Sequence, residues 1–447
     1  MRLQSKWLLS LAITASLAAQ TKLLRFPDIH DDRIAFTYGG DLWLVNAAGG
    51  TATRLTAHPG VELFAKFSPD GKWIAFTGQY DGDEQVYVMP ADGGEPKQLT
   101  FYPAQGPLPP RWGYDNQVYG WSNDGHYVIY RGMRDARAHA LTRLYRVPID
   151  GGPSEPLPMP VSGAGSFSPG GNQIVYSPQA RDFRTEKRYS GGEANQLYIF
   201  DTETHAAKLI TGGPRASRDP MWIGKEIYYD SDRDGHFNIY AYDTATGQTR
   251  QITQYNLWDV RWPSTDRRQR IVYELDGELQ ILDVKTGKST HISVRVPDDG
   301  VNRRPSYVSA ANLIEQVEFS PKGERVLFAA RGDIFSAPVE KGPTRNLTHS
   351  PGAHDKWPAW SPDGSKVAFL SDASGEEEVY VVAQDGSSPP EKITSGGHAF
   401  RYDTKWSPDN GRIAFSDKDG RLWVVSLKDH ATQEVAHSTE GEIRDYA

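Results

Sequence analysis

One acidic stretch of the sequence has the spacing of a calcium-binding loop. "DSDRDG" at 230–235 places three aspartates on alternate positions ahead of Gly235, as the first half of such a loop does. A functional loop needs a bidentate Glu at its twelfth position, and Ala241 stands there. We therefore interpret the stretch as a hairpin turn between strands, and we predict no metal site and no cofactor.

Other chemistry-bearing motifs are missing from the sequence. It has no G-x-S-x-G nucleophile elbow, no H-E-x-x-H zinc motif, no Walker loop and no G-x-G-x-x-G after a strand. The 12 histidines are scattered, and His349 and His354 share a turn in which we expect structural roles. The chain has no cysteine, which excludes thiolate nucleophiles and disulfides. We predict no catalytic residue in this chain.

One motif recurs along the sequence, and the elements that it forms must position any functional side chains. Each copy has an aromatic residue, a Ser-Pro-Asp-Gly turn and a short apolar strand, in which Pro fixes φ, Asp bonds nearby backbone and Gly takes a positive φ. The clear copies are "FSPDGKWIAF" (67–76), "WSNDGHYVIY" (121–130), "FSPGGNQIVY" (167–176), "FSPKGERVLF" (319–328), "WSPDGSKVAF" (360–369) and "WSPDNGRIAF" (406–415), with degenerate copies at 27–36, 221–229 and 261–273.

Each copy begins a unit of four short antiparallel strands, which is the strand count and spacing of a propeller blade. We count nine units, more than the usual four to eight blades of one ring. The sequence therefore predicts an all-β chain of tandem β-propellers, with a complete six-bladed propeller at 23–297, a crossover linker at 298–316, and the first three blades of a truncated second propeller at 317–447. A β-sandwich is the structural alternative, but it does not explain nine related units in register.

The last residues, "EGEIRDYA" at 440–447, resemble the lead-in to another Ser-Pro-Asp-Gly turn. Three blades cannot close a ring, and an open sheet edge favours aggregation. We therefore expect the natural chain to continue beyond Ala447.

The N-terminus has the composition of a secretory signal peptide. Arg2 and Lys6 form a basic region, Trp7–Leu17 a short apolar region, and Ser16-Leu17-Ala18 supplies small residues for cleavage. We predict a signal peptide at 1–19 and a periplasmic or secreted protein.

The charge and hydropathy of the sequence argue against nucleic-acid binding and against a membrane span. The formal net charge is −8, and it becomes −10 when the signal peptide and its two basic residues are removed. With no long basic run, nucleic-acid binding is not expected. No apolar stretch approaches the ~20 residues of a membrane span, so we predict none.

Three features of the sequence resemble the tricorn protease family. They are the stretch "PDIHDDRIAF…GGDLW" (27–43) within 23–71, the six-unit propeller followed by a second one, and "KRYSGG" (187–192) in the enlarged fourth unit. The similarity covers the chain from Leu23 to Ala447. The Ser-Pro-Asp-Gly repeats alone are less specific, because TolB and many other propellers carry them.

The resemblance implies a function that this chain can fill only in part. Members of the family have a six-bladed and a seven-bladed propeller ahead of a serine peptidase core with a PDZ domain, form hexamers and degrade short peptides. Their propellers act as channels for substrate and product. The catalytic Ser, His and Glu are expected beyond this chain, so none is assigned here. The archaeal relative is cytosolic, which makes a cytoplasmic location the alternative.

One substrate-binding residue is implied by the same resemblance. In the family, a pair of arginines on a first-propeller loop holds the C-terminal carboxylate of the peptide by charge-assisted hydrogen bonds. The matching region is 106–125, where Arg111 is the arginine available and Trp112 follows it. Arg111 is the candidate peptide anchor, and an arginine on an ordinary loop is the alternative. Glu186 stands where the family usually has an aromatic residue.

Two hypotheses about function follow. In the first, the chain is the peptide-binding and gating region of a tricorn-like exported serine peptidase, with short peptides as ligands and a hexamer as the assembly. In the second, it is a TolB-like propeller that binds or scaffolds other proteins of the cell envelope and has no catalytic partner on the same chain.

Overall fold

The computed structural model describes residues 21–103, 113–134, 142–179, 188–298, 300 and 308–446. The described residues form strands, turns and loops, and they include no helix that could cross a membrane. The chain divides into two compact units, residues 1–303 and 304–447. The expected signal peptide at 1–19 lies outside the described residues, as do 299 and 301–307 of the expected linker.

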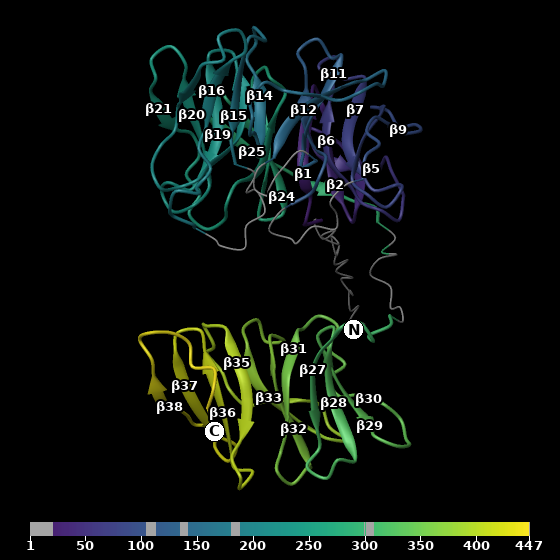
Figure 1. Ribbon diagram of the computed structural model, residues 1–447, viewed down its shortest axis with the longest axis vertical. Coiled ribbons are helices and arrows are strands. Elements are labelled where there is room, and N and C mark those ends of the chain that lie inside the picture. The colour runs from purple at the N-terminus through teal and green to yellow at the C-terminus, as the bar shows by residue number, and fades with distance from the viewer. Residues whose placement is uncertain are drawn as a thin grey trace, which may run out of the picture. The chain divides into compact units, whose positions relative to one another are not determined.

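The first unit contains six four-stranded antiparallel sheets, each in simple up-and-down order (Figure 1). Their strands are β1 (Arg25–His30), β2 (Arg33–Tyr38), β3 (Asp41–Asn46) and β5 (Thr53–Arg54); β6 (Glu62–Phe67), β7 (Trp73–Gly78), β8 (Gln85–Pro90) and β9 (Lys97–Gln98); β10 (Gln117–Trp121), β11 (Tyr127–Gly132), β12 (Arg143–Pro148) and β13 (Glu155–Pro156); β14 (Ala164–Phe167), β15 (Gln173–Ser177), β16 (Tyr198–Asp201) and β17 (Ala207–Leu209); β18 (Ser217–Ile223), β19 (Glu226–Ser231), β20 (Asn238–Asp243) and β21 (Thr249–Gln251); and β22 (Arg261–Thr265), β23 (Arg270–Leu275), β24 (Glu278–Asp283) and β25 (Lys288–Ile292).

The second unit has three further sheets of the same kind. Their strands are β27 (Ile314–Phe319), β28 (Arg325–Ala330), β29 (Asp333–Pro338) and β30 (Arg345–Asn346); β31 (Asp355–Trp360), β32 (Lys366–Ser371), β33 (Glu378–Ala383) and β34 (Glu391–Lys392); and β35 (Arg401–Trp406), β36 (Arg412–Asp417), β37 (Arg421–Ser426) and β38 (Thr432–His437). The prediction of an all-β chain of tandem propellers, with six sheets followed by three, is confirmed.

The first unit closes into a ring. The first strand of each sheet lies at the centre and contacts the first strand of the next sheet, and β1 contacts both β6 and β22. A parallel pair adds to the closure. β26 (Val294–Arg295) follows the sixth sheet and bonds to β4 (Gly50–Thr51), which lies between β3 and β5 in the chain and forms a separate two-stranded sheet with β26. Gly49, at φ +89°, makes this approach possible: a Cβ there would lie 2.6 Å from the carbonyl oxygen of Ser293.

The predicted turn chemistry is present in the Ser-Pro-Asp-Gly copies. In the second sheet, the Ser68 hydroxyl donates to Asp70 Oδ1 at 2.6 Å and accepts from the Trp73 amide at 3.0 Å, and Gly71 has φ +70°. Hydrogen bonds from Ser68 and from backbone hold the pKa of Asp70 below its usual value. The turn therefore fixes how the central strand of each sheet leads into the second strand.

A buried threonine explains why many units end on "LT" or "IT". In the first sheet the Thr56 hydroxyl accepts from the Leu42 amide and donates to Glu62 Oε2, both at 2.8 Å. The same threonine bond to a third-strand amide recurs at Thr100, Thr211, Thr253, Thr348 and Thr394. This hydroxyl satisfies a buried amide where the short fourth strand ends.

We expect Thr56→Val to lower the free energy of unfolding by about 1–3 kcal/mol, because it leaves the Leu42 amide and a Glu62 oxygen without their bonds. Urea unfolding followed by tryptophan fluorescence measures the change. Thr53→Val is the control, since Thr53 is exposed in the same sheet. Equal stability of the two variants would show that the buried hydroxyl contributes nothing.

The raised pKa of the Glu62 carboxyl predicts that stability depends on pH. Burial, with a smaller contribution from Asp41, raises the pKa of this carboxyl to about 7, against an ordinary value of 4.5. The folded state therefore holds the proton more tightly, and stability falls as the pH rises from about 4.5 to 7. Between pH 5 and 8 the wild type should lose about 2 kcal/mol more than Glu62→Gln, as measured by urea unfolding at each pH. Parallel pH profiles for the two proteins would contradict this assignment.

Candidate functional site

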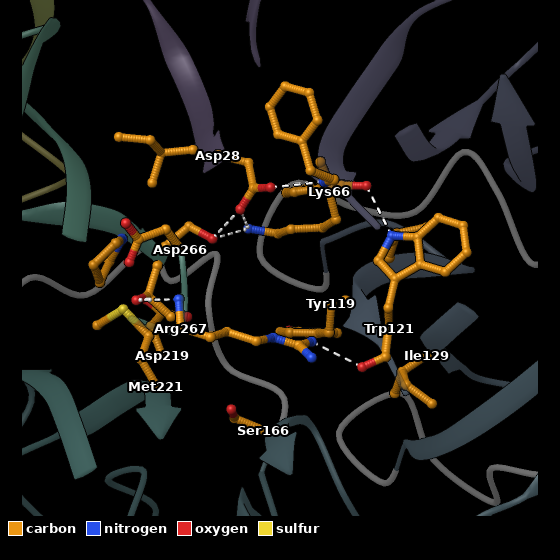
Figure 2. Close-up of a pocket in the computed structure, with 18 of the residues that line it drawn as sticks. Asp28, Lys66, Tyr119, Trp121, Ile129, Ser166, Asp219, Met221, Asp266 and Arg267 are labelled. Carbon is orange, nitrogen blue, oxygen red and sulfur yellow. Dashed lines mark hydrogen bonds and ion pairs between the residues drawn. The ribbon is translucent and has the colours of Figure 1, made fainter. Parts of the chain in front are cut away.

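A cavity of about 230 Å³ lies at the axis of the first unit. All six central strands, β1, β6, β10, β14, β18 and β22, contribute residues to its wall. Figure 2 shows polar and apolar side chains from these strands pointing into it. The cavity is therefore the central channel of the propeller, the place where propeller folds commonly carry function.

The central strands turn large side chains toward the axis through a β-bulge. In β1, β6, β18 and β22 the pairing with the second strand shifts register near the start of the strand. One residue in each shift has a left-handed backbone: Phe26 (φ 52°), Phe64 (φ 57°), Asp219 (φ 47°) and Trp262 (φ 50°). Such conformations cost free energy in residues other than glycine and occur often at functional sites.

Three of these bulge residues meet near the axis and line the cavity. The ring centroids of Phe26 and Phe64 are 4.4 Å apart, and Trp262 lies 4.8 Å from Phe26 and 5.9 Å from Phe64. Phe64 and Trp262 come from sheets that are not neighbours, so their contact requires both rings to reach the axis. Tyr114 adds an edge contact at 5.6 Å from Phe64. We call Phe26, Phe64 and Trp262 the aromatic floor.

A polar layer lies two residues further along the same strands. Lys66 Nζ donates to Ser264 Oγ at 2.7 Å and lies 3.6 Å from Asp28 Oδ1. Asp28 is buried, accepts from the Phe67 amide at 2.7 Å, and also accepts from the Ser264 hydroxyl. The layer therefore joins the first, second and sixth sheets through one partly buried ion pair and its hydrogen bonds.

The contact between Ser264 and Lys66 has the residue types of a Ser–Lys catalytic pair. Such a pair needs a neutral amine to accept the serine proton. Here Lys66 is ion-paired with Asp28, and the Ser264 hydroxyl already donates to the same carboxylate. The arrangement fits a structural clamp better than a nucleophile.

The Arg267 side chain crosses the channel. It follows β22 of the sixth sheet and donates from Nη2 to the Trp121 carbonyl oxygen, at the end of β10 in the third sheet, at 2.8 Å. A longer bond of 3.4 Å joins Nη1 to Asn123 Oδ1. The third and sixth sheets face each other across a six-membered ring, so the side chain spans the channel, as Figure 2 shows. The cavity thus lies between the aromatic floor and the Arg267 side chain.

Arg111, the site residue predicted from the sequence, lies outside the described residues, as does Glu186. Its role as a peptide anchor stays a prediction. Asp28, Lys66, Trp262 and Arg267 were not predicted from the sequence.

The "KRYSGG" segment has a structural contact in the described part of the chain. Arg188 pairs with both carboxylate oxygens of Asp259 at 2.9 Å, and its Nη2 lies 3.0 Å from His236 Nδ1. Asp259 precedes β22, so this bidentate pair ties the enlarged fourth unit to the approach to the sixth sheet.

The acidic "DSDRDG" stretch is the hairpin between β19 and β20, as interpreted from the sequence. Asp230 pairs with Arg218 at 2.8 Å, and Asp232 accepts from the Ala216 amide at 2.9 Å. Within the described ranges no group of three or more His, Asp or Glu side chains is placed to hold a metal ion.

The buried pair of Asp28 and Lys66 predicts strong coupling. Asp28→Asn should lower the free energy of unfolding by about 2–3 kcal/mol, because it leaves a partly buried ammonium without its counter-ion. In a Lys66→Met background the same change should cost under about 1 kcal/mol. Urea unfolding of the four proteins gives the coupling free energy.

The control for this cycle is Lys225→Met, whose exposed ammonium lies 3.9 Å from Asp243 and should contribute less than about 0.5 kcal/mol. Additive effects of Asp28→Asn and Lys66→Met would show that the polar layer is not a coupled pair.

Comparisons with known proteins agree with the fold. Residues 21–288 match the family model of the tricorn protease N-terminal beta propeller domain, and residues 314–447 match that of the second beta propeller domain. Tricorn protease homolog 1 of Streptomyces coelicolor is 29% identical over 434 residues, which cover 94% of this chain and 39% of the relative. Tricorn protease of Thermoplasma acidophilum is 28% identical over 320 residues, covering 70% and 28%.

A crystal structure of the tricorn protease superposes with a TM-score of 0.68 at 22% identity, covering 95% of this chain and 40% of that one, which supports the fold. The chain thus spans well under half the length of these curated relatives. With both propeller models matched in order, the chain belongs to the tricorn protease family, over its N-terminal and second β-propeller domains.

Proposed function

We propose that this chain is the peptide-binding and gating region of an exported serine peptidase that degrades short peptides. The observation that carries the proposal is the match of both propeller domains, in order, to a family whose curated members are called proteases. A serine peptidase core elsewhere in the native protein would perform the hydrolysis. This chain would select peptides and control their access.

The central cavity supports a role in ligand selection. It is lined by six strands, and an ion pair, an arginine and the aromatic floor all face it. A few placed polar groups among apolar walls are the usual composition of a small-ligand site. A scaffold alone needs no such convergence of charged and strained residues at its axis.

Location and assembly form the second part of the proposal. The basic and apolar N-terminal residues support export, so the peptides would come from proteins degraded outside the cytoplasm. A hexameric ring is the proposed assembly, by resemblance to the family.

The experiment is to isolate the native protein from the periplasmic and secreted fractions with an antibody against this chain. We expect a species much larger than 49.7 kDa, labelled by a serine-reactive fluorophosphonate and able to hydrolyse short peptides. Size-exclusion chromatography with light scattering would give its oligomeric state. The cytoplasmic fraction is the control for location.

Two results would contradict the proposal. A native species near the mass of this chain, with no label and no hydrolysis, would favour a free-standing propeller that binds other envelope proteins. A large, labelled species found only in the cytoplasm would support the proposed peptidase and contradict the proposed export.

A further inference from the structure

A groove lies between the second and third sheets of the first unit, outside the axial cavity. It has a volume of about 620 Å³ and is lined by the turns before β7 and β11, by β8 and β9, and by the turn after β12. Trp73, the first residue of β7, stands in its wall and is 38% exposed. A large aromatic ring left exposed beside a groove is a common feature of binding sites.

The repeat allows this groove to be compared with other gaps between sheets. The first residue of the second strand is Trp73 in the second sheet, but Arg33 in the first and Arg270 in the sixth. Arg33 donates from Nη2 to the Gly71 carbonyl oxygen in the turn of the next sheet at 2.6 Å. Arg270 donates in the same way to the Asp31 carbonyl oxygen in the turn of the first sheet. An arginine at this position thus joins its own sheet to the next one around the ring.

The groove beside the second sheet has the acceptors for such an arginine. In the gap between the first and second sheets, Arg33 also pairs with Asp92 of the "ADGG" turn at 2.8 Å. The equivalent acceptors of the third sheet are Asp150 of the "IDGG" turn and the carbonyl oxygen of Gly125, which has φ +73° where Gly71 has +70°. Among the described residues, neither of these acceptors has a hydrogen-bonding or ion-pair partner. The positions that hold a guanidinium in one gap are therefore open in the next.

The charge of the groove favours a cation. Three carboxylates line it, those of Asp70, Asp124 and Asp150, against the single ammonium of Lys97. Hydrogen bonds from a serine hydroxyl and from backbone hold the pKa of Asp124 below its usual value, so this carboxylate is ionised at neutral pH. Lys97 donates to the Ile149 carbonyl oxygen at 3.1 Å and, in the described part of the chain, pairs with none of the three carboxylates. The groove thus keeps a net negative charge.

A guanidinium matches these groups better than an ammonium does. Its planar fork directs donors toward several acceptors at once, as Arg33 shows by binding a carboxylate and a carbonyl oxygen together. It can also lie on the face of the Trp73 ring, where cation–π attraction adds to the hydrogen bonds. A lysine ammonium is a compact point charge and is less suited to joining Asp150 and the Gly125 carbonyl oxygen.

We propose that this groove binds an arginine side chain of an extended peptide, with Asp150 and the Gly125 carbonyl oxygen as acceptors and Trp73 as the stacking surface. The ligand would supply the group that Arg33 supplies within the protein one gap earlier. The inference goes beyond the proposed function and does not rest on it, because the contacts require neither a peptidase core nor export.

The test is a titration of the full chain with the capped peptide acetyl-Gly-Arg-Gly-amide, followed by saturation-transfer difference NMR. Acetyl-Gly-citrulline-Gly-amide has nearly the same shape without the charge, and acetyl-Gly-Lys-Gly-amide has the charge without the fork. Low ionic strength is used because exposed charges are screened by salt. We expect the arginine peptide to bind about tenfold more tightly than the citrulline peptide, with the lysine peptide in between.

Two variants locate the site. Asp150→Asn removes an exposed carboxylate and should reduce the preference for arginine over citrulline to less than about threefold. Trp73→Arg restores the arginine of the repeat and should abolish binding, because the new side chain occupies the acceptors itself. Asp92→Asn is the matched control, since it removes the equivalent carboxylate from the gap that Arg33 already fills, and it should leave the affinity unchanged. Thermal melting checks that all three variants fold.

Several results would overturn the proposal: equal affinity for the arginine and citrulline peptides, equal affinity for the arginine and lysine peptides, or no binding of any of them. A preference for arginine that persists in Asp150→Asn or in Trp73→Arg would also overturn it, as would its loss in Asp92→Asn. The hydrolysis assay on the native protein uses none of these variants, so failure of this inference and failure of the proposed function can be recognised separately.

Discussion

The β-bulge of the central strands is the constraint on which the first unit depends. Six strands that meet around one axis leave a space that their own side chains must fill or line. The left-handed residue in the bulge rotates Phe26, Phe64 and Trp262 to the axis, where ordinary pleating would point them elsewhere. The strain at these residues is offset by the ring contacts and by the ion pair two positions further along.

The aromatic floor and the Arg267 side chain are held by different interactions. The floor consists of ring contacts between residues of the first, second and sixth sheets. Arg267 depends on two hydrogen bonds to neutral oxygens of the third sheet and the turn that follows it. Apolar and polar contacts thus both join sheets that are not neighbours in the ring.

Much of the fold could be predicted because its signals are local. Each Ser-Pro-Asp-Gly turn forms its own hydrogen bonds, and each closing threonine accepts from an amide of the same repeat unit, so the repeat alone identifies the blades. Ring closure by β26 and β4 could not be predicted, since it joins Val294 to Gly50 through two-residue strands with no pattern of their own.

The site was harder to predict because its residues come from different sheets. A signal exists in retrospect: "FPD", "FAK" and "WPS" place an aromatic residue two positions before a polar one in three central strands. This pattern can be interpreted only with the bulge, because the bulge sets the direction of both side chains. The repeat does not reveal the bulge. Arg267 lies in a degenerate turn, "STDRRQR". The three arginines of this turn bind different partners: Trp121, Asp31 and Asp266.

A crystal structure of the full chain would test the central claim, that the bulges of the central strands bring side chains of three sheets together at the axis of the first propeller. The account predicts mutual contact of the Phe26, Phe64 and Trp262 rings, with Lys66 bound to Asp28 and Ser264 two residues further along. Regular pleating of these strands, with the three rings pointing away from the axis, would contradict it.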